Sequence, residues 1–318
     1  MITPDLTDWL PISISKHAAE PVVEWCRFGT RRFTEAFYDH TVQNAMRDPF
    51  NLLFRHQTPL DALLDQQAFR PGLQPSGFIF HMSRCGSTLV SQMLAALPEH
   101  IVLSEPAPLD AILRTDRRGA SDHQRIAWLR AWISAMGQPR NGEQRLYVKL
   151  DAWQTFDLPL LRRAFPDTPW IFLYRNPIEV MVSASKVPGM HLVPNMVDLN
   201  TLAIAPFDAQ QMTHLQYIAR VLAEVLRAAL QYIGPLGGKA LDYATLPESV
   251  ITTIAPHFNL SLDASQIAAI NATTPFHAKQ PQMYFEPDAL SKQQEANEEM
   301  YALCAAHLDP LYVQLRAL

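Results

Sequence analysis

The chain is poor in cysteine and has no excess of positive charge. Three cysteines occur among 318 residues, at Cys26, Cys85 and Cys304, and their odd number and wide spacing exclude a disulfide framework and a zinc-binding pattern. The formal net charge of −5 argues against nucleic acid as a partner, because duplex binding normally requires a basic face. The 11 histidines lack the spacing of metal ligands, so we expect no metal.

The sequence also has no uninterrupted apolar run as long as a membrane span. The longest helical candidate, near residues 221–232, is interrupted by Glu224 and Arg227. Asp5 and Asp8 precede any basic residue, which is unlike a signal peptide. We therefore expect a cytoplasmic protein that does not bind a membrane. With 48% apolar residues, the chain can bury a large core in one α/β domain with an appendage or in two small domains.

The most informative segment that is present is GFIFHMSRCGSTLV, at residues 77–90. Its apolar start predicts a buried strand, and the apolar residues that follow the loop recur at helical spacing. Gly86, Ser87 and Thr88 therefore lie in the first helical turn, where unpaired backbone N–H groups bind phosphate or sulfate. Arg84 adds a guanidinium with several fixed donors. The segment predicts a site for a multiply charged anion.

The order of residues in this loop distinguishes two kinds of nucleotide-binding protein. A Walker A loop has a lysine and then a hydroxyl after its last glycine, and the chain contains no such stretch. Here the cation precedes the glycine, and Arg84-Cys85-Gly86-Ser87-Thr88 resembles the 5′-phosphosulfate loop of the sulfotransferase family. The resemblance implies that these five residues bind the 5′ end of 3′-phosphoadenosine 5′-phosphosulfate (PAPS), with Cys85 contributing its backbone N–H.

A second segment, WIFLYRNPIEVMVSA at residues 170–184, also reads as a strand followed by a helix. Pro177 fits the first position of that helix. Arg175, Pro177 and Ser183 keep the spacing of the motif with which sulfotransferases bind the ribose 3′-phosphate, although Asn176 replaces the more usual aspartate. The resemblance implies that Arg175 and Ser183 bind this phosphate. A buried strand that ends in arginine would otherwise leave a charge without a partner.

A third similarity concerns catalysis. The segment from Arg84 to Glu105, and Lys149 at the end of a later apolar run, resemble the protein-tyrosine sulfotransferase branch. Sulfuryl transfer requires a base for the acceptor proton and cations that stabilise the departing oxygen. The resemblance implies that Glu105 is the base and that Arg84 and Lys149 are the cations. The residues also allow plainer roles: Glu105 at a helix start, and Lys149 paired with Asp151.

Two further positions correspond to family features in part. Tyr243 follows a short apolar run and resembles the tyrosine that sulfotransferases have near the 3′-phosphate and adenine. Many family members close a basic loop over the 3′-phosphate, and here the corresponding segment has His277 and Lys279 as its basic residues. The resemblance implies that Tyr243 and Lys279 contact the donor. A core tyrosine and a solvated loop are the alternative interpretations.

The chain alternates strand and helix patterns, which predicts βα units and a parallel sheet. The predicted strands are 77–82, 101–104, 145–149, 168–174 and 238–242, and the predicted helices are 86–97, 121–136, 154–165, 177–186 and 209–233. The resemblance implies an α/β, three-layer, P-loop NTPase-like sulfotransferase fold at residues 71–318. Residues 1–70 precede several Pro and Gly positions and predict a mainly helical N-terminal extension.

These resemblances identify the chain as a PAPS-dependent sulfotransferase that uses no metal. The implied acceptor is a hydroxyl, with an amine as the alternative, on a small molecule or a peptide. Golgi enzymes of the tyrosine-sulfating branch carry a membrane anchor, so its absence implies a bacterial, cytoplasmic enzyme. Residues 187–196 lack periodicity and predict a loop over the active site. The sequence is compatible with an oligomer. The alternatives are a small-molecule kinase of related fold and a non-catalytic nucleotide-binding protein.

Overall fold

The computed structural model describes residues 6–15, 21–284, 286 and 288–318. The chain forms two compact units, each discontinuous in sequence. The first unit contains the chain up to Gly77 together with residues 91–149 and 160–168, and the second contains residues 78–90, 150–159 and 169–318. The units do not follow the predicted boundary at residue 70, because residues 91–149 group with the N-terminal segment.

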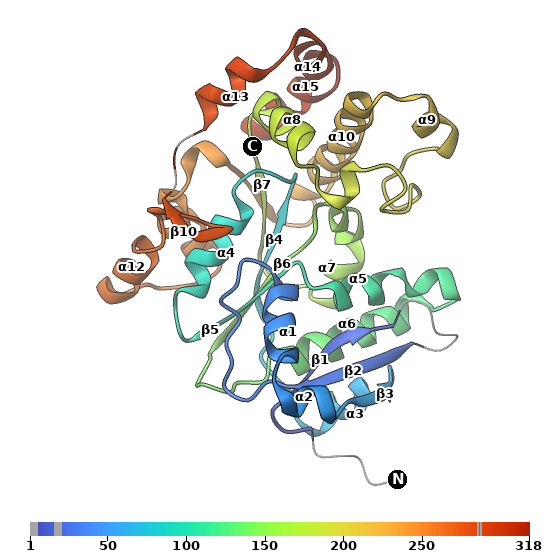
Figure 1. Ribbon diagram of the computed structural model, residues 1–318, viewed down its shortest axis with the longest axis vertical. Coiled ribbons are helices and arrows are strands. Elements are labelled where there is room, and N and C mark those ends of the chain that lie inside the picture. The colour runs from blue at the N-terminus through green and yellow to red at the C-terminus, as the bar shows by residue number, and fades with distance from the viewer. Residues whose placement is uncertain (1–5, 16–20, 285, 287) are drawn as a thin grey trace. The chain divides into compact units, whose positions relative to one another are not determined.

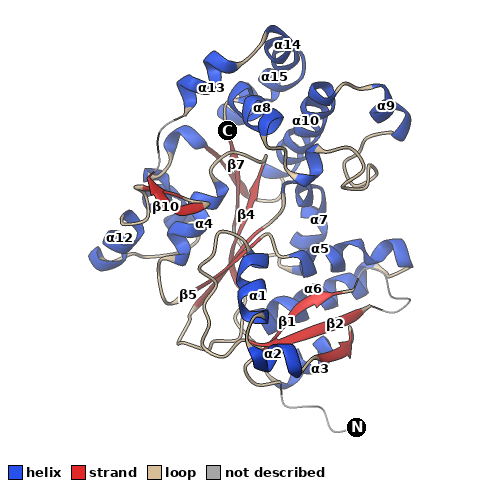
Figure 2. Ribbon diagram, in the orientation of Figure 1, coloured by secondary structure: helices blue, strands red, loops and turns tan. Residues whose placement is uncertain are grey.

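A parallel sheet is the central element of the fold. Its strands, in spatial order, are β5 (His100–Ser104), β6 (Arg145–Lys149), β4 (Pro75–His81), β7 (Trp170–Tyr174) and β8 (Gly238–Asp242). The pairs β5–β6, β4–β7 and β7–β8 are parallel, and Figure 2 shows β4 and β7 side by side. The five strands match the predicted ones within two residues at each end. The predicted α/β class with a parallel sheet flanked by helices is confirmed.

Strands β4, β5 and β7 of this sheet are buried on both faces, as expected for a parallel sheet, whereas the edge strand β8 is mostly half-exposed. All five residues of β7 are buried. Its first residue, Trp170, is fully buried and donates its indole N–H to the carbonyl of Leu236 at 2.9 Å. Each polar residue that follows such a strand is therefore at a fixed point at the end of a rigid element.

Helices of the second unit follow the strands, and α10 (His214–Ile233) is the longest of them. Thr213 and Gln216 form a capping box at its start, with each side chain bonding the other residue's backbone N–H. The predicted helix at 209–233 is therefore wrong in its first residues, because this cap begins a new helix after α9 (Pro206–Gln211).

The remaining helical elements of this unit are short. They are the 3₁₀ turns η2 (Ala152–Asp157), η3 (Met190–Leu192) and η4 (Tyr243–Thr245), the π-helical η5 (Val250–Ile254) and η6 (Cys304–Leu308), and the helices α8 (Pro177–Lys186), α11 (Ala255–His257), α12 (Ala264–Asn271), α13 (Ala289–Glu295), α14 (Glu298–Leu303) and α15 (Asp309–Arg316). A two-stranded antiparallel ribbon of β9 (Phe276–His277) and β10 (Gln280–Tyr284) lies between α12 and α13 in the chain. Helices α4 (Ser87–Ala95) and α7 (Leu158–Ala164) have residues in both units.

The N-terminal part of the first unit differs from its prediction. It contains the helices α1 (Tyr38–Met46), α2 (Pro49–Leu53) and α3 (Ala62–Phe69), but also an antiparallel sheet of β1 (Trp9–Ile14), β2 (Val22–Arg27) and β3 (His56–Pro59). The expectation of a mainly helical extension omitted this sheet. Trp25 explains part of the difference, because its buried indole N–H donates to Thr58 Oγ1 at 2.8 Å and joins two strands far apart in sequence.

The described part of the first unit contains three more helical elements. They are α5 (Ala107–Leu113), the 3₁₀ turn η1 (Arg114–Arg118) and α6 (Asp122–Met136). Both α5 and α6 pack against β1 (Figure 1). The indole N–H of Trp132, on α6, donates to the carbonyl of Pro11 at 3.0 Å.

Candidate active site

The loop after β4 adopts a backbone conformation that most residues avoid. Ser83, Arg84 and Gly86 have positive φ angles of 79°, 54° and 82°. Such angles in non-glycine residues cost roughly 1–3 kcal/mol each and gather at functional sites. The thiol of buried Cys85 donates to the carbonyl of Leu173 at 3.1 Å, so this residue fastens the loop to β7. The predicted anion loop is thus a tight turn held against the sheet.

The two predicted phosphate motifs meet through a side-chain contact. Arg84 Nε donates to Ser183 Oγ at 2.7 Å, although the two residues are 99 positions apart. Ser183 lies in the second turn of α8, where Pro177 is among the first residues and the side chain of Asn176 accepts from the N–H of Ile178. The predicted strand end and helix start of the second motif are confirmed by this arrangement.

Tyr243 packs between the two motifs. A Cβ at Gly86 would come within 2.7 Å of the Tyr243 ring, so only glycine permits this approach. The guanidinium carbon of Arg175 lies 4.0 Å from the centre of the same ring, in a cation–π contact. Burial raises the pKa of the Tyr243 hydroxyl. The structure therefore brings together Arg84, Gly86, Arg175, Ser183 and Tyr243 in the second unit.

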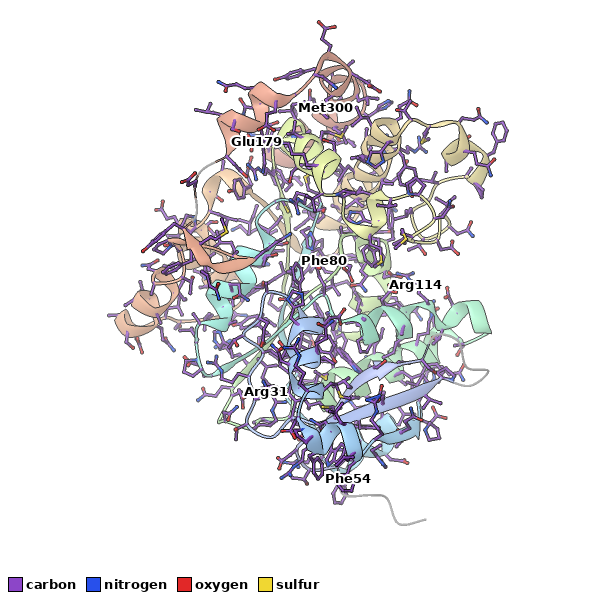
Figure 3. The ribbon with its side chains drawn as sticks, viewed as in Figure 1. Arg31, Phe54, Phe80, Arg114, Glu179 and Met300 are labelled. Carbon is purple, nitrogen blue, oxygen red and sulfur yellow. The ribbon has the colours of Figure 1, made fainter. Side chains whose placement is uncertain are left out.

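Arg175 already has two carboxylate partners. Its Nε pairs with Glu179 at 2.6 Å and its Nη2 with Asp288 at 2.7 Å; Figure 3 labels Glu179 on α8. Burial lowers the pKa of Arg175, but the hydrogen bonds to Asp288 and Glu179 outweigh this effect and raise it. The argument that this buried arginine needs a ligand for its charge is therefore wrong, because the chain itself supplies two carboxylates.

A further cation of this cluster was not predicted. Lys292, on α13, pairs with Asp288 at 2.5 Å. Burial lowers the pKa of Lys292, and the nearby charges of Arg175 and Arg84 act in the same direction, whereas Asp288 raises it. The Asp288–Lys292 spacing of four residues is typical of a solvated helix face, so the sequence offered no signal of a site.

The predicted catalytic pair, Glu105 and Lys149, lies in the first unit. The parallel register of β5 and β6 pairs Ser104 with Lys149, and the next backbone N–H, that of Glu105, donates to the carbonyl of Lys149 at 2.8 Å. Lys149 Nζ lies 3.0 Å from Glu105 Oε1, so Glu105 is an ion-pair partner of this lysine. Lys149 is fully buried, whereas the Glu105 side chain is 22% exposed.

Two more features distinguish this pair. Glu105 has a positive φ of 56°, which is a second strained position at the end of a strand of the sheet. Lys149 Nζ also lies 5.1 Å from the centre of the Phe37 ring, a residue of the N-terminal segment. The N-terminal segment therefore contacts the buried Lys149 ammonium group.

The predicted closing loop lies at the antiparallel ribbon of β9 and β10. Lys279 lies in the turn between β9 and β10 and is exposed. The side chain of His277 lies outside what the structure describes. The contact of Lys279 with a donor stays a prediction, as do the donor contacts of Ser87 and Thr88, which are buried at the start of α4.

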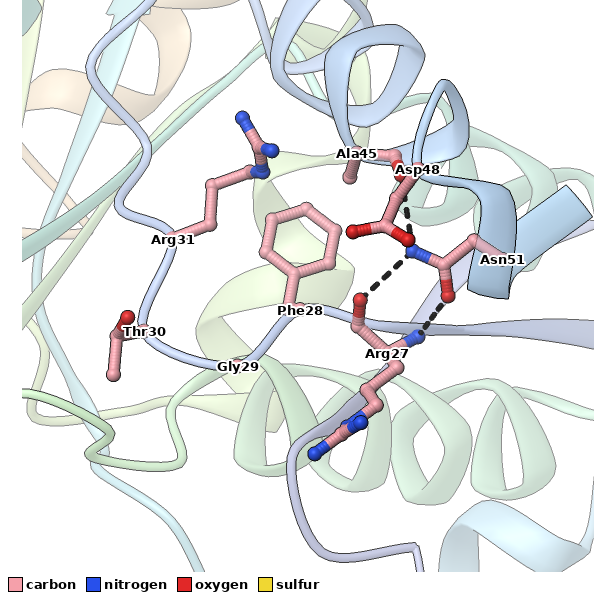
Figure 4. A pocket seen from close by; sticks show the side chains of 8 residues that line it. All are labelled: Arg27, Phe28, Gly29, Thr30, Arg31, Ala45, Asp48 and Asn51. Carbon is pink, nitrogen blue, oxygen red and sulfur yellow. Dashed lines mark hydrogen bonds between the residues drawn. The ribbon is translucent and has the colours of Figure 1, made fainter.

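A cavity of about 410 Å³ in the first unit involves none of the predicted site residues. Its lining residues are Arg27, Phe28, Gly29, Thr30, Arg31, Ala45, Asp48 and Asn51 (Figure 4). Asn51 uses its amide to hold backbone, since it donates to the carbonyls of Arg27 and Ala45 and accepts from the N–H of Arg27. Asn51 thus serves the local fold, and we assign the cavity no ligand.

No group of three or more His, Cys, Asp or Glu side chains is arranged to hold a metal ion in the described part of the chain. None of the described helices has both the length and the apolar character needed to cross a membrane.

Comparison with known proteins identifies the family. Residues 75–264 match the model of the sulfotransferase family, which is well over half of the chain. The protein therefore belongs to the sulfotransferase family, as its two phosphate motifs predicted. The match does not distinguish the tyrosine-sulfating branch, so that assignment stays a prediction. No curated protein matches the sequence.

Solved structures with a similar chain trace are bacterial sulfotransferases. STF9 from Mycobacterium avium shares 15% identity at a TM-score of 0.48, with 79% of this chain and 81% of that chain covered. The sulfotransferase from Alicyclobacillus acidocaldarius shares 17% identity at a TM-score of 0.45, with 77% and 95% covered. Similarities at this level assign no residue roles.

Proposed function

We propose that the protein transfers a sulfuryl group from PAPS to an acceptor hydroxyl. Membership of the sulfotransferase family supports sulfuryl transfer in general. The observation that carries the choice of donor is the contact between Arg84 and Ser183, because it joins the residues expected at the 5′ and 3′ ends of PAPS. A hydroxyl acceptor, on a small molecule or a peptide, follows from the resemblance described above.

The second unit has the groups that such a donor requires. Arg175 and Ser183 bind the 3′-phosphate, and Tyr243 orients the guanidinium of Arg175 through the contact with its ring. The backbone N–H groups of 86–88 bind the 5′ end at the start of α4. Lys279 adds a positive charge from the turn between β9 and β10.

Three residues act on the reacting groups in this proposal. Glu105 takes the proton of the acceptor hydroxyl as its oxygen bonds to sulfur, and Lys149 holds Glu105 in position through the 3.0 Å ion pair. Arg84 and Lys149 stabilise the charge on the oxygen whose bond to sulfur breaks. PAPS supplies the sulfuryl group and leaves as adenosine 3′,5′-bisphosphate.

Calorimetric titration of the full chain with adenosine 3′,5′-bisphosphate tests the donor site. We expect binding by the wild type and a loss of about 100-fold in affinity for Arg175→Ala, since a charge-assisted contact to phosphate is lost. Arg220→Ala is the matched control, because Arg220 is a half-exposed arginine paired with Glu224 on α10. Its affinity should equal that of the wild type.

Titration with ATP and magnesium tests the kinase alternative in the same experiment. A preference for ATP with magnesium over the bisphosphate would contradict the proposal and favour a kinase. Absence of binding by either nucleotide would favour a protein that has kept the fold without the activity. The family match and the lack of a Walker A loop both weigh against the kinase.

A further inference from the structure

One carboxylate, that of Asp288, lies among the cations of the proposed donor site. Its Oδ1 accepts from Arg175 Nη2 at 2.7 Å and its Oδ2 pairs with Lys292 Nζ at 2.5 Å. Burial lowers the pKa of Arg84, whereas the charge of Asp288 acts in the opposite direction, so Arg84 also senses this carboxylate. Two cations, Arg175 and Lys292, therefore pair directly with this one carboxylate.

The carboxylate of Asp288 does not cap the helix that follows it. It is the residue before α13, where an aspartate normally accepts from backbone N–H groups of the first helical turn. Its side chain makes no such capping bond. Both oxygens are instead directed to Arg175 and Lys292, in the way that a bound phosphate would share two cations.

The two carboxylates on Arg175 differ in their access to solvent. The Glu179 side chain is 7% exposed and occupies Nε, and the ring of Tyr243 covers one face of the guanidinium. The Asp288 side chain is 42% exposed and occupies Nη2. An anion that arrives from solvent therefore meets Arg175 at the group that Asp288 holds.

We propose that Asp288 competes with the 3′-phosphate of the donor for Arg175 and Lys292, and that Lys292 binds this phosphate once Asp288 is displaced. The proposal rests on the donor site proposed above and adds a residue and a regulatory step to it. A phosphate dianion brings two negative charges where the carboxylate brings one, so the exchange gains attraction to both cations.

The rest of the cluster is suited to this exchange. Glu179 keeps its bond to Arg175 Nε and accepts from Gln293 Nε2 at 2.9 Å, so α8 and α13 stay linked when Asp288 leaves. Glu295 at the other end of α13 pairs with Lys186 of α8. The displacement therefore requires movement at the start of α13 and not release of the whole helix.

Titration of three single variants with adenosine 3′,5′-bisphosphate tests the competition. Asp288→Asn keeps the shape but removes the charge, and we expect it to bind about fivefold more tightly than the wild type. Lys292→Gln should bind about tenfold more weakly. Glu295→Gln removes the exposed pair at the other end of the same helix and should change affinity less than twofold.

The outcomes separate this proposal from the function on which it rests. If the wild type binds and Asp288→Asn binds no more tightly than Glu295→Gln, the competition is wrong and the donor site remains. If Lys292→Gln binds like the wild type, the assignment of Lys292 as a phosphate ligand is wrong. If neither the wild type nor Asp288→Asn binds, both proposals fail.

The rates of amide hydrogen exchange distinguish displacement of Asp288 from a salt bridge that stays intact when the bisphosphate binds. We expect the first-turn amides of α13 to exchange faster in the bisphosphate complex than in the free protein, because displacement of Asp288 loosens this end. Residues of β7 should exchange at the same rate or more slowly. Slower exchange at the start of α13 on binding would contradict the displacement.

Discussion

The Glu105–Lys149 pair of the first unit and the Arg175 cluster of the second unit combine the same kinds of charge in different proportions. In the first, one fully buried lysine faces one carboxylate, and the carboxylate is the more exposed partner. In the second, the buried Arg175 has two carboxylates, and Lys292 and Arg84 add further positive charge. The pair has no net charge, and its carboxylate is the group nearer the solvent. The cluster has three cations and two carboxylates, and therefore a net positive charge.

This difference indicates which chemistry each region favours. A cation that is buried behind a partly exposed carboxylate holds that carboxylate in one position, as a general base requires. A surplus of cations behind a replaceable carboxylate favours the binding of a more highly charged anion. The comparison predicts that the two regions can be disabled separately.

Glu105→Gln should give the largest effect and separates the two regions most clearly. We expect transfer from PAPS to fall about 1,000-fold, because the amide cannot take the acceptor proton, while bisphosphate affinity stays at the wild-type value. Steady-state rates and calorimetry measure the two quantities. Glu24→Gln is the control, because Glu24 is about as exposed as Glu105 and pairs with the exposed Arg55 in the same unit. A parallel loss of affinity and rate in Glu105→Gln would contradict the separation.

Lys149→Met should reduce the stability of the first region. The change removes the buried partner of Glu105 and is expected to lower the free energy of unfolding by about 2 kcal/mol, less than for a fully buried pair because Glu105 is partly exposed. Urea denaturation measures it, and Arg55→Met, which removes the exposed partner of Glu24, should cost at most about 1 kcal/mol. Equal costs for the two variants would show that burial of Lys149 is unimportant.

Gly86→Ala tests how tightly the second region is packed. Gly86 and Gly142 share a φ of +82°, but an added Cβ meets the Tyr243 ring at 2.7 Å at Gly86 and nothing within 4 Å at Gly142. Backbone strain is common to both variants, so the difference in unfolding free energy isolates the clash, at about 1–2 kcal/mol. Bisphosphate affinity should fall only for Gly86→Ala. Equal stabilities would indicate that Tyr243 moves aside.

The pH dependence of the Asp288 contacts should be the smallest effect. Burial raises the pKa of Asp288, but the bonds from Arg175 and Lys292 outweigh it and lower the pKa below the ordinary 3.8. Because the pKa is lower in the folded state, the contacts of Asp288 stabilise the fold fully above about pH 4. This contribution is lost as the pH falls through the pKa of Asp288 in the folded protein. Thermal unfolding of the wild type and Asp288→Asn should therefore differ by a constant amount from pH 7 to 5, and less at pH 3. A difference that grows on acidification would contradict this sign.

The positions of β4, β5 and β7 could be predicted because each is a short apolar run in which both faces are buried. The phosphate motifs could be predicted because each follows such a strand at a fixed spacing, as Arg84 and Arg175 show. The small antiparallel sheet was missed, since its pairs, such as Trp25 with Thr58, join residues far apart in the chain. The start of α10 was missed because a capping box at Thr213 divides a continuous helical pattern.

Local patterns in the sequence thus determined the family, the parallel sheet, and which residues follow its strands. They did so because periodicity, glycine and proline act over a few neighbouring residues. Only the tertiary structure decided which charges meet: Lys149 pairs with Glu105 through the register of two strands, and Arg175 meets Asp288 from 113 residues away. Electrostatic attraction depends on distance in space, and no local pattern in the sequence fixes that distance for residues so far apart.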